Sequence, residues 1–196
     1  KPDVIVAVST PAAHAAKTPA HSTLDADKIE AAAGELLAPF ERAAGPDAYS
    51  IHRKLQDSMH ALVGIFRSEE DLKKGIEEIQ KLKAEARRIR VEGTRAFNPG
   101  WHLAHDLRSM LIVSEAVARC ALQRKESRGA HARLDHTGLD PELGRVNSVA
   151  AMDGEDVRIT QSPLPTMPAE LRALIEAEPT LRDYFPPAGK PAAERP

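Results

Sequence analysis

Apolar residues recur every three or four positions through residues 24–124, which is the spacing of one face of an α-helix. The pattern is interrupted by glycine, proline and capping residues, which divide it into four segments. These segments begin after Asp25, near Tyr49, after Ser68 and after Asn98. Because each segment has a single apolar face, we predict four amphipathic helices that pack together.

The last two helices are predicted to be the longest. Residues of the third form a narrow apolar stripe flanked by charges: Leu72, Ile76, Ile79, Leu82, Ala86 and Ile89. The fourth carries the same period from Leu103 to about Arg124. A short connection at Gly93–Asn98 makes these helices antiparallel neighbours. We therefore predict a mainly α fold, an antiparallel three- to four-helix bundle similar to a spectrin repeat.

Helical periodicity stops at Arg124. Two short strands, 147–151 and 157–161, flank Asp153 and Gly154 and predict a small C-terminal β-hairpin. A short helix is expected near 168–176. The predicted organisation has four parts: a linker or arm at 1–23, the helical bundle at 24–124, an irregular segment with the hairpin and short helix at 125–185, and a disordered tail at 186–196.

Composition narrows the classes of partner. The formal net charge of -2 gives no overall field that would attract nucleic acid or an anionic membrane. The longest apolar runs are far shorter than the ~20 residues that span a bilayer, so we expect no direct membrane span. The single cysteine, Cys120, excludes an intramolecular disulfide. Because the sequence begins at Lys1, we expect a longer natural chain whose N-terminal signals are not represented.

The densest group of candidate functional residues follows the fourth helix, at 124–133. One interpretation is local: Arg124 and Lys125 meet the negative end of the helix, and Gly129 permits a sharp turn. The other is a docking surface, in which Arg128 and Arg133 bind carboxylates across an interface in bidentate fashion and Glu126 orients one of them. Ser127 and His131 complete the candidate set.

Other arrangements give weak signals for chemistry. His102, His105 and Asp106 have helical spacing that suits a metal site, but polar residues at a helix start have the same pattern. Trp101 is expected to pack between helices. Cys120 lies in a regular helix, and Ser127 beside His131 lacks the G-x-S-x-G turn of a nucleophile. No G-x-G-x-x-G or Walker loop is present. We predict no catalytic, cofactor-binding or metal-ligating residue in this chain.

Several motifs together resemble one family. The segments 98–101, 106–111 and 114–119 lead into Arg124-Lys-Glu-Ser-Arg-Gly-Ala-His-Ala-Arg-Leu-Asp135. This order is similar to that of the C-terminal domain of succinate dehydrogenase and fumarate reductase flavoproteins, and L-aspartate oxidases share a related version. The similarity extends upstream through 55–59 and Phe66-Arg67. It departs at His136-Thr137-Gly138, where relatives often have an aromatic residue and proline.

The resemblance implies what the parent protein does. Such proteins interconvert succinate and fumarate at a covalently held FAD and pass electrons to an iron-sulfur subunit. The resemblance also implies a bacterial protein that is peripheral to the cytoplasmic face of the inner membrane. The family's catalytic motifs have no counterpart here, so this fragment is expected to hold no FAD and to be inactive alone. Its expected partners are the flavin-binding domain and the iron-sulfur subunit. Two alternatives are an L-aspartate oxidase domain and an autonomous helical adaptor.

Overall fold

The computed structural model describes residues 5–6 and 25–177, and the predicted tail at 186–196 lies outside these residues. The helices are α1 (Ala26–Glu41), α2 (Ala48–Leu62), α3 (Glu69–Ala86), α4 (Pro99–Gln123) and α5 (Ala169–Ala177). The strands are β1 (Ile5–Val6), β2 (Phe66–Arg67), β3 (Ala132–Arg133), β4 (Val146–Asp153) and β5 (Asp156–Pro163), with a 3-10 turn at Leu143–Arg145. The chain is divided into two compact units, Lys1–Ser162 and Pro163–Pro196. Helix α5 belongs to the second unit.

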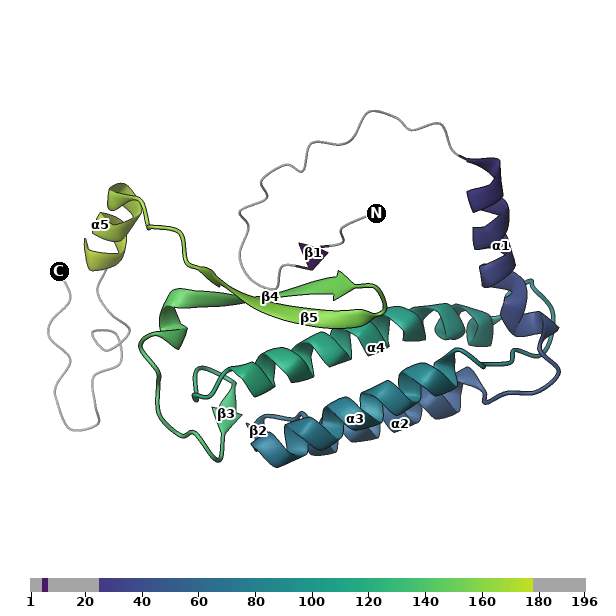
Figure 1. Ribbon diagram of the computed structural model, residues 1–196, viewed down its shortest axis with the longest axis horizontal. Coiled ribbons are helices and arrows are strands. Elements are labelled where there is room, and N and C mark those ends of the chain that lie inside the picture. The colour runs from purple at the N-terminus through teal and green to yellow at the C-terminus, as the bar shows by residue number, and fades with distance from the viewer. Residues whose placement is uncertain (1–4, 7–24, 178–196) are drawn as a thin grey trace, which may run out of the picture. The chain divides into compact units, whose positions relative to one another are not determined.

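Helices α2, α3 and α4 pack against one another and form the core of the first unit (Figure 1). The two longest, α3 and α4, lie side by side and run antiparallel, as predicted. The side chains at the interfaces of the three helices are almost fully buried, and the central ones are Ile51 of α2, Leu72 and Ile79 of α3, and Leu107 and Leu111 of α4. Ile89 is also buried, although α3 ends before it. The predicted mainly α bundle with a small hairpin is confirmed.

Each bundle helix starts at a side chain that accepts a backbone hydrogen bond. Asp47 accepts from Ser50 N, Ser68 from Asp71 N and Asn98 from Trp101 N. Such caps satisfy N–H groups that have no partner within the helix, and each contributes about 1 kcal/mol. The predicted starts of the second, third and fourth helices are therefore confirmed by their geometry.

Helix α1 forms as predicted but contributes little to the core. Asp25 caps it, yet Pro39 is its only buried residue, and Ile29 and Leu36 remain exposed. Trp101 ties α1 to α4, because its indole Nε1 donates to the carbonyl of Leu36 at 2.8 Å. The Trp101 ring also packs on Phe40 with a centroid distance of 5.5 Å. Trp101 thus packs between helices, as expected.

Two small sheets complete the first unit. The predicted hairpin is β4–β5, it lies along α4, and Gly154 has the positive φ of 66° that its tight loop requires (Figure 1). Strand β1, within the predicted arm, pairs antiparallel with β4. A parallel pair, β2–β3, was not predicted from the sequence; it joins Phe66 to Ala132 and Arg67 to Arg133. None of the helices in the described ranges is long and apolar enough to cross a bilayer.

Candidate docking site after helix α4

Glu126 is the centre of the candidate site and is completely buried. Its carboxylate accepts from Arg124 Nη2 at 2.5 Å, from Arg128 Nη2 at 3.0 Å and from the backbone N–H of Asp140 at 3.0 Å. Burial would raise the pKa of Glu126, but these donors outweigh it and lower the pKa to about 2. Glu126 therefore stays ionised and fixes the positions of two arginines.

Arg128 is the most accessible charged group of the predicted set, with 42% of its side chain exposed. Both its Nε and its Nη2 face Glu126, and this pairing raises the pKa of the guanidinium. Gly129, with a φ of 59°, follows in a tight turn that brings Arg128 and His131 into backbone pairing. The turn presents Arg128 at the surface while Glu126 limits its orientation.

Arg133 lies inside the protein, with 1% exposure. Its fork binds both carboxylate oxygens of Asp135, each at 2.7 Å, and lowers the pKa of that carboxyl well below its usual range. The remaining Nη1 donates to carbonyls at the end of α4, including that of Ala121 at 3.1 Å. Arg133 thus caps the helix C-terminus and makes its bidentate contact within the chain. Within this chain the bidentate partner of Arg133 is Asp135, and the predicted contact of Arg133 with a carboxylate across an interface stays a prediction.

Ser127 is committed to holding the loop. Its Oγ accepts from the backbone N–H of Arg133 at 2.8 Å and donates to the carbonyl of His136 at 2.8 Å. A hydroxyl used in this way is not activated by His131, whose ring nitrogens have other partners.

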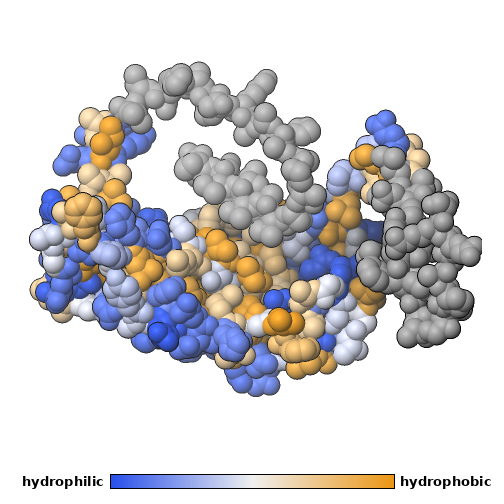
Figure 2. Space-filling model, turned by 180° about the vertical axis from the view of Figure 1, so that it is seen from behind, coloured by the Kyte–Doolittle hydropathy of each residue, from blue (hydrophilic) through white to orange (hydrophobic). Residues whose placement is uncertain are grey.

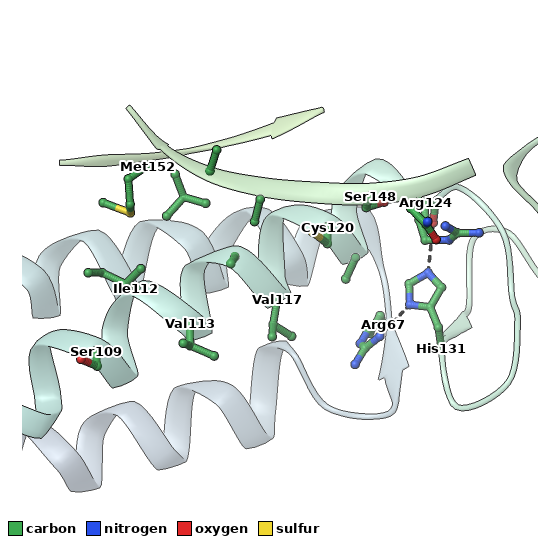
Figure 3. Close-up of a pocket in the computed structure, with 16 residues that line it drawn as sticks. Arg67, Ser109, Ile112, Val113, Val117, Cys120, Arg124, His131, Ser148 and Met152 are labelled. Atoms are coloured by element: carbon green, nitrogen blue, oxygen red, sulfur yellow. Dashed lines mark hydrogen bonds between the residues drawn. The ribbon is translucent and has the colours of Figure 1, made fainter. Parts of the chain in front are cut away.

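His131 links the loop to β2. Its Nε2 lies 3.0 Å from the carbonyl of Arg124 and must donate there, so Nδ1 accepts from Arg67 Nη1 at 2.6 Å (Figure 3). Burial lowers the pKa of His131; the bond to the Arg124 carbonyl opposes this change, and the neighbouring charges of Arg67 and Arg133 reinforce it. A neutral His131 therefore fits both contacts.

Arg67 is the functional candidate that the sequence reasoning missed. It precedes the cap of α3, and its Nε donates to the carbonyl of Gly64 at 2.6 Å. The short β2–β3 pair places it beside the 124–135 loop, although Arg67 and His131 are 64 positions apart in sequence. The only sequence signal was its place in the Phe66-Arg67 element of the family resemblance.

One group of side chains in the described part of the chain has the spacing of metal ligands: Glu69, Asp135 and His136, with ligand atoms within 4.8 Å of one another. Both Asp135 oxygens already bind Arg133, and Glu69 pairs with Lys73 at 2.7 Å. The weak candidate His102, His105 and Asp106 is not brought together in this way, since His105 Nε2 lies 3.1 Å from the carbonyl of Leu36.

An apolar groove of about 520 Å³ lies beside the loop, between α4 and the β4–β5 hairpin. Its walls include Val113, Val117 and Met152, and Arg67, Arg124 and His131 form its polar end (Figure 3). Cys120 also lines it, and burial raises the pKa of that thiol against the opposing charge of Arg124. Apolar side chains are visible over the middle of one face of the molecule (Figure 2).

These features define a helical domain with an arginine-rich, internally paired loop. The family model described as "Fumarate reductase flavoprotein C-term" matches residues 52–184. The chain therefore belongs to this family and is a C-terminal domain of the succinate dehydrogenase and fumarate reductase flavoproteins.

Individual relatives agree with this assignment. A fumarate reductase flavoprotein subunit of Haemophilus influenzae is 32% identical over 117 residues, covering 57% of this chain and 20% of the relative. A succinate dehydrogenase flavoprotein subunit of Coxiella burnetii is 35% identical over 105 residues, covering 53% of this chain and 18% of the relative. The chain thus spans about a fifth of the length of these curated relatives.

A solved structure of Mycobacterium smegmatis Sdh1 in complex with UQ1 has the same fold. It superposes with a TM-score of 0.75 at 38% identity, covering 82% of this chain and 28% of that chain. The likeness includes most of the described residues and extends beyond the bundle.

Proposed function

We propose that this chain is a structural and docking domain of a dicarboxylate-oxidising or fumarate-reducing flavoprotein. The observation that carries the proposal is the family match over 52–184 in a chain that spans only about a fifth of its relatives. A domain of this kind supports the flavin-binding part rather than performing the chemistry. The absence of a G-x-G-x-x-G motif from the sequence agrees with this division of labour.

The parent protein, in this proposal, interconverts succinate and fumarate at FAD and passes electrons to an iron-sulfur subunit. The names of the relatives support this chemistry. The parent would be peripheral to the cytoplasmic face of the inner membrane through its complex. This chain alone then holds no FAD and turns over no dicarboxylate.

Arg128 is the proposed point of contact with the iron-sulfur subunit. Its charge is partly exposed, and Glu126 preorganises the guanidinium, which reduces the entropy lost on binding. Exposed apolar groups accompany the neighbouring β2–β3 pair: Phe66 is 72% exposed, and Leu134, directly after β3, is 64% exposed. Large exposed apolar side chains beside an ordered charge are features of contact surfaces. The buried residues Arg133 and Glu126 hold the loop that carries this surface in place.

The test is complex assembly by the full-length flavoprotein with Arg128→Ala. We expect at least ~10-fold weaker binding of the iron-sulfur subunit, the effect of losing a contact of about 1.4 kcal/mol. FAD content and dicarboxylate binding should be unchanged. Arg145→Ala is the matched control, because Arg145 is an exposed arginine whose one ion pair among the described residues is with Glu142 at 3.3 Å. Normal assembly with lost dicarboxylate binding would instead place Arg128 in the active site.

An L-aspartate oxidase is the second candidate parent. An Acinetobacter baylyi L-aspartate oxidase is 37% identical over 90 residues, covering 46% of this chain and 16% of the relative. Such a parent would oxidise aspartate and would function without an iron-sulfur subunit. Aspartate-dependent reduction of the full-length protein's FAD, with no subunit copurifying, would select it over the dehydrogenase.

A further inference from the structure

The groove between α4 and the β4–β5 hairpin leaves apolar side chains of α4 accessible. Val113 is 48% exposed and Val117 is 38% exposed, although both line the groove. Met152 and Val157 face them from the hairpin. Apolar side chains gathered in a concave surface gain free energy when another apolar group covers them.

The polar end of the groove holds an arginine without a carboxylate partner among the described residues. Arg124 and Arg128 pair with Glu126, and Arg133 pairs with Asp135. Arg67, in contrast, donates only to uncharged acceptors within the described chain, namely the carbonyls of Val63 and Gly64 and Nδ1 of His131.

The geometry leaves one end of the Arg67 guanidinium available. Nε is held by Gly64 and Nη1 by His131, while Nη2 has no hydrogen bond to any residue in the described ranges. Partial burial lowers the pKa of Arg67, and the nearby charge of Arg133 adds to this effect. A half-buried cation that is fixed in place and has no counter-ion in the described part of the chain favours an incoming carboxylate.

We propose that the groove receives a segment of the flavin-binding part of the same polypeptide, with apolar side chains along α4 and a carboxylate on Arg67. This inference rests on the proposed function. Charge complementarity selects an acidic, apolar segment over a basic one. The occupant is assigned to the same polypeptide because this chain covers only 28% of the Mycobacterium smegmatis relative, so a parent of that size has further segments that could fill the groove.

His131 is a positioning residue in this arrangement. Its Nε2–H donates to the Arg124 carbonyl, so its Nδ1 lone pair is directed at Arg67 Nη1. That bond holds the guanidinium at the end of the groove and leaves Nη2 for the carboxylate.

The first test is photocrosslinking of the full-length flavoprotein with p-benzoylphenylalanine in place of Val113. Mass spectrometry should find the crosslink on a peptide outside residues 1–196 that carries Asp or Glu next to apolar residues. The control position is Lys81, an exposed side chain of α3 paired with Glu78, which should not capture that peptide. Mixing isotope-labelled and unlabelled protein distinguishes the same polypeptide from a second copy.

The outcomes separate this inference from the proposed function. A crosslink within 1–196, to a second copy or to another protein, or no crosslink at all, overturns the inference even when the protein binds FAD. A full-length protein without flavin overturns the proposed function and, with it, this occupant.

The second test uses Cys120 as a native reporter of groove coverage. In the full-length protein, Arg67→Gln should increase the rate of alkylation at Cys120 about tenfold, as expected for the loss of one charge-assisted contact. Arg145→Gln should leave the rate unchanged. Replacing the acidic residue found by crosslinking with its amide should reproduce the increase, with FAD content retained. An unchanged alkylation rate of Cys120 in Arg67→Gln and in the amide variant would contradict pairing of a carboxylate with Arg67.

Discussion

Gly45 lies in the connection between α1 and α2, where this connection contacts the backbone that follows α3. A Cβ at this position would lie 1.9 Å from the carbonyl oxygen of Arg88, and backbone atoms cannot yield as a side-chain end can. Two hydrogen bonds hold these segments together, from Arg90 N to the Pro46 carbonyl at 3.1 Å and from Val91 N to the Pro39 carbonyl at 2.9 Å. The absence of a side chain therefore permits this contact.

Gly45→Ala should lower the free energy of unfolding by about 2 kcal/mol or more, because overpacking forces backbone shifts. Chemical denaturation of the chain measures this directly. Gly138→Ala is the control, since a Cβ there meets nothing within 4 Å, and its effect should stay within ~0.5 kcal/mol. Equal effects of the two substitutions would show that the contact at Gly45 is not tight.

Residue chemistry alone predicted only part of the candidate site. The sequence predicts a site at Glu126–His131 because charges, a glycine and a histidine follow a helix end. Its pairing could not be derived, since Arg128 and Arg133 have the same residue type and opposite environments. The difference arises from the turn at Gly129 and from β3, which direct one arginine outward and the other beneath α4.

Helices were more predictable than their contacts because periodicity and caps are local signals. The starts at Ser68 and Asn98 follow from side chains that bind nearby N–H groups. The β2–β3 pair depends on contacts between distant segments of two residues each, which have no periodic pattern. For α1 the helix is predictable but its packing is not. An amphipathic stripe predicts that a helix forms, but it does not show whether another element covers the apolar face.

A buried carboxylate joins α3, α4 and the hairpin. Glu115 in α4 is fully buried and accepts from Gln80 Nε2 at 2.6 Å, Lys83 Nζ at 2.8 Å and Arg119 Nε at 2.7 Å. Lys83 also donates to the Glu155 carbonyl at the hairpin turn. Loss of Glu115 would leave a mostly buried ammonium without its counter-ion.

Glu115→Ala should therefore destabilise the chain by about 3 kcal/mol, the usual cost of breaking a buried pair on one side. Thermal or urea unfolding followed by circular dichroism gives the difference. Glu142→Ala removes an exposed carboxylate paired with Arg145 and should cost less than ~1 kcal/mol. A Glu115→Ala variant as stable as this control would mean that solvent replaces the lost partner.

At the scale of the whole molecule, buried carboxylates make the free energy of unfolding depend on pH. The family match begins at residue 52 and therefore includes α3, α4 and the loop that closes on Glu126. That loop depends on one ionised side chain, which binds Arg124, Arg128 and the backbone of Asp140. Protonation of Glu126 would weaken all three contacts together.

Acid should therefore destabilise the folded chain through Glu126. The pKa of Glu126 is lowered to about 2 in the folded protein, whereas an unfolded glutamate titrates near ~4.3. The unfolded chain takes up the proton first, so the stability contributed by Glu126 is complete above ~4.3 and is lost as the pH falls to about 2. Urea unfolding measured at intervals across this range should show a falling free energy of unfolding.

Glu126→Gln is the decisive comparison for this pH dependence. The variant cannot titrate at this position, so its free energy of unfolding should be lower at neutral pH and should fall less steeply in the acid range. Asp135, whose pKa is also lowered by Arg133, continues to titrate in both proteins and supplies a shared slope. The difference between the two curves therefore isolates Glu126. Parallel curves would show that its carboxylate is not held by the arginines in solution, and the surface position of Arg128 would then lack its support.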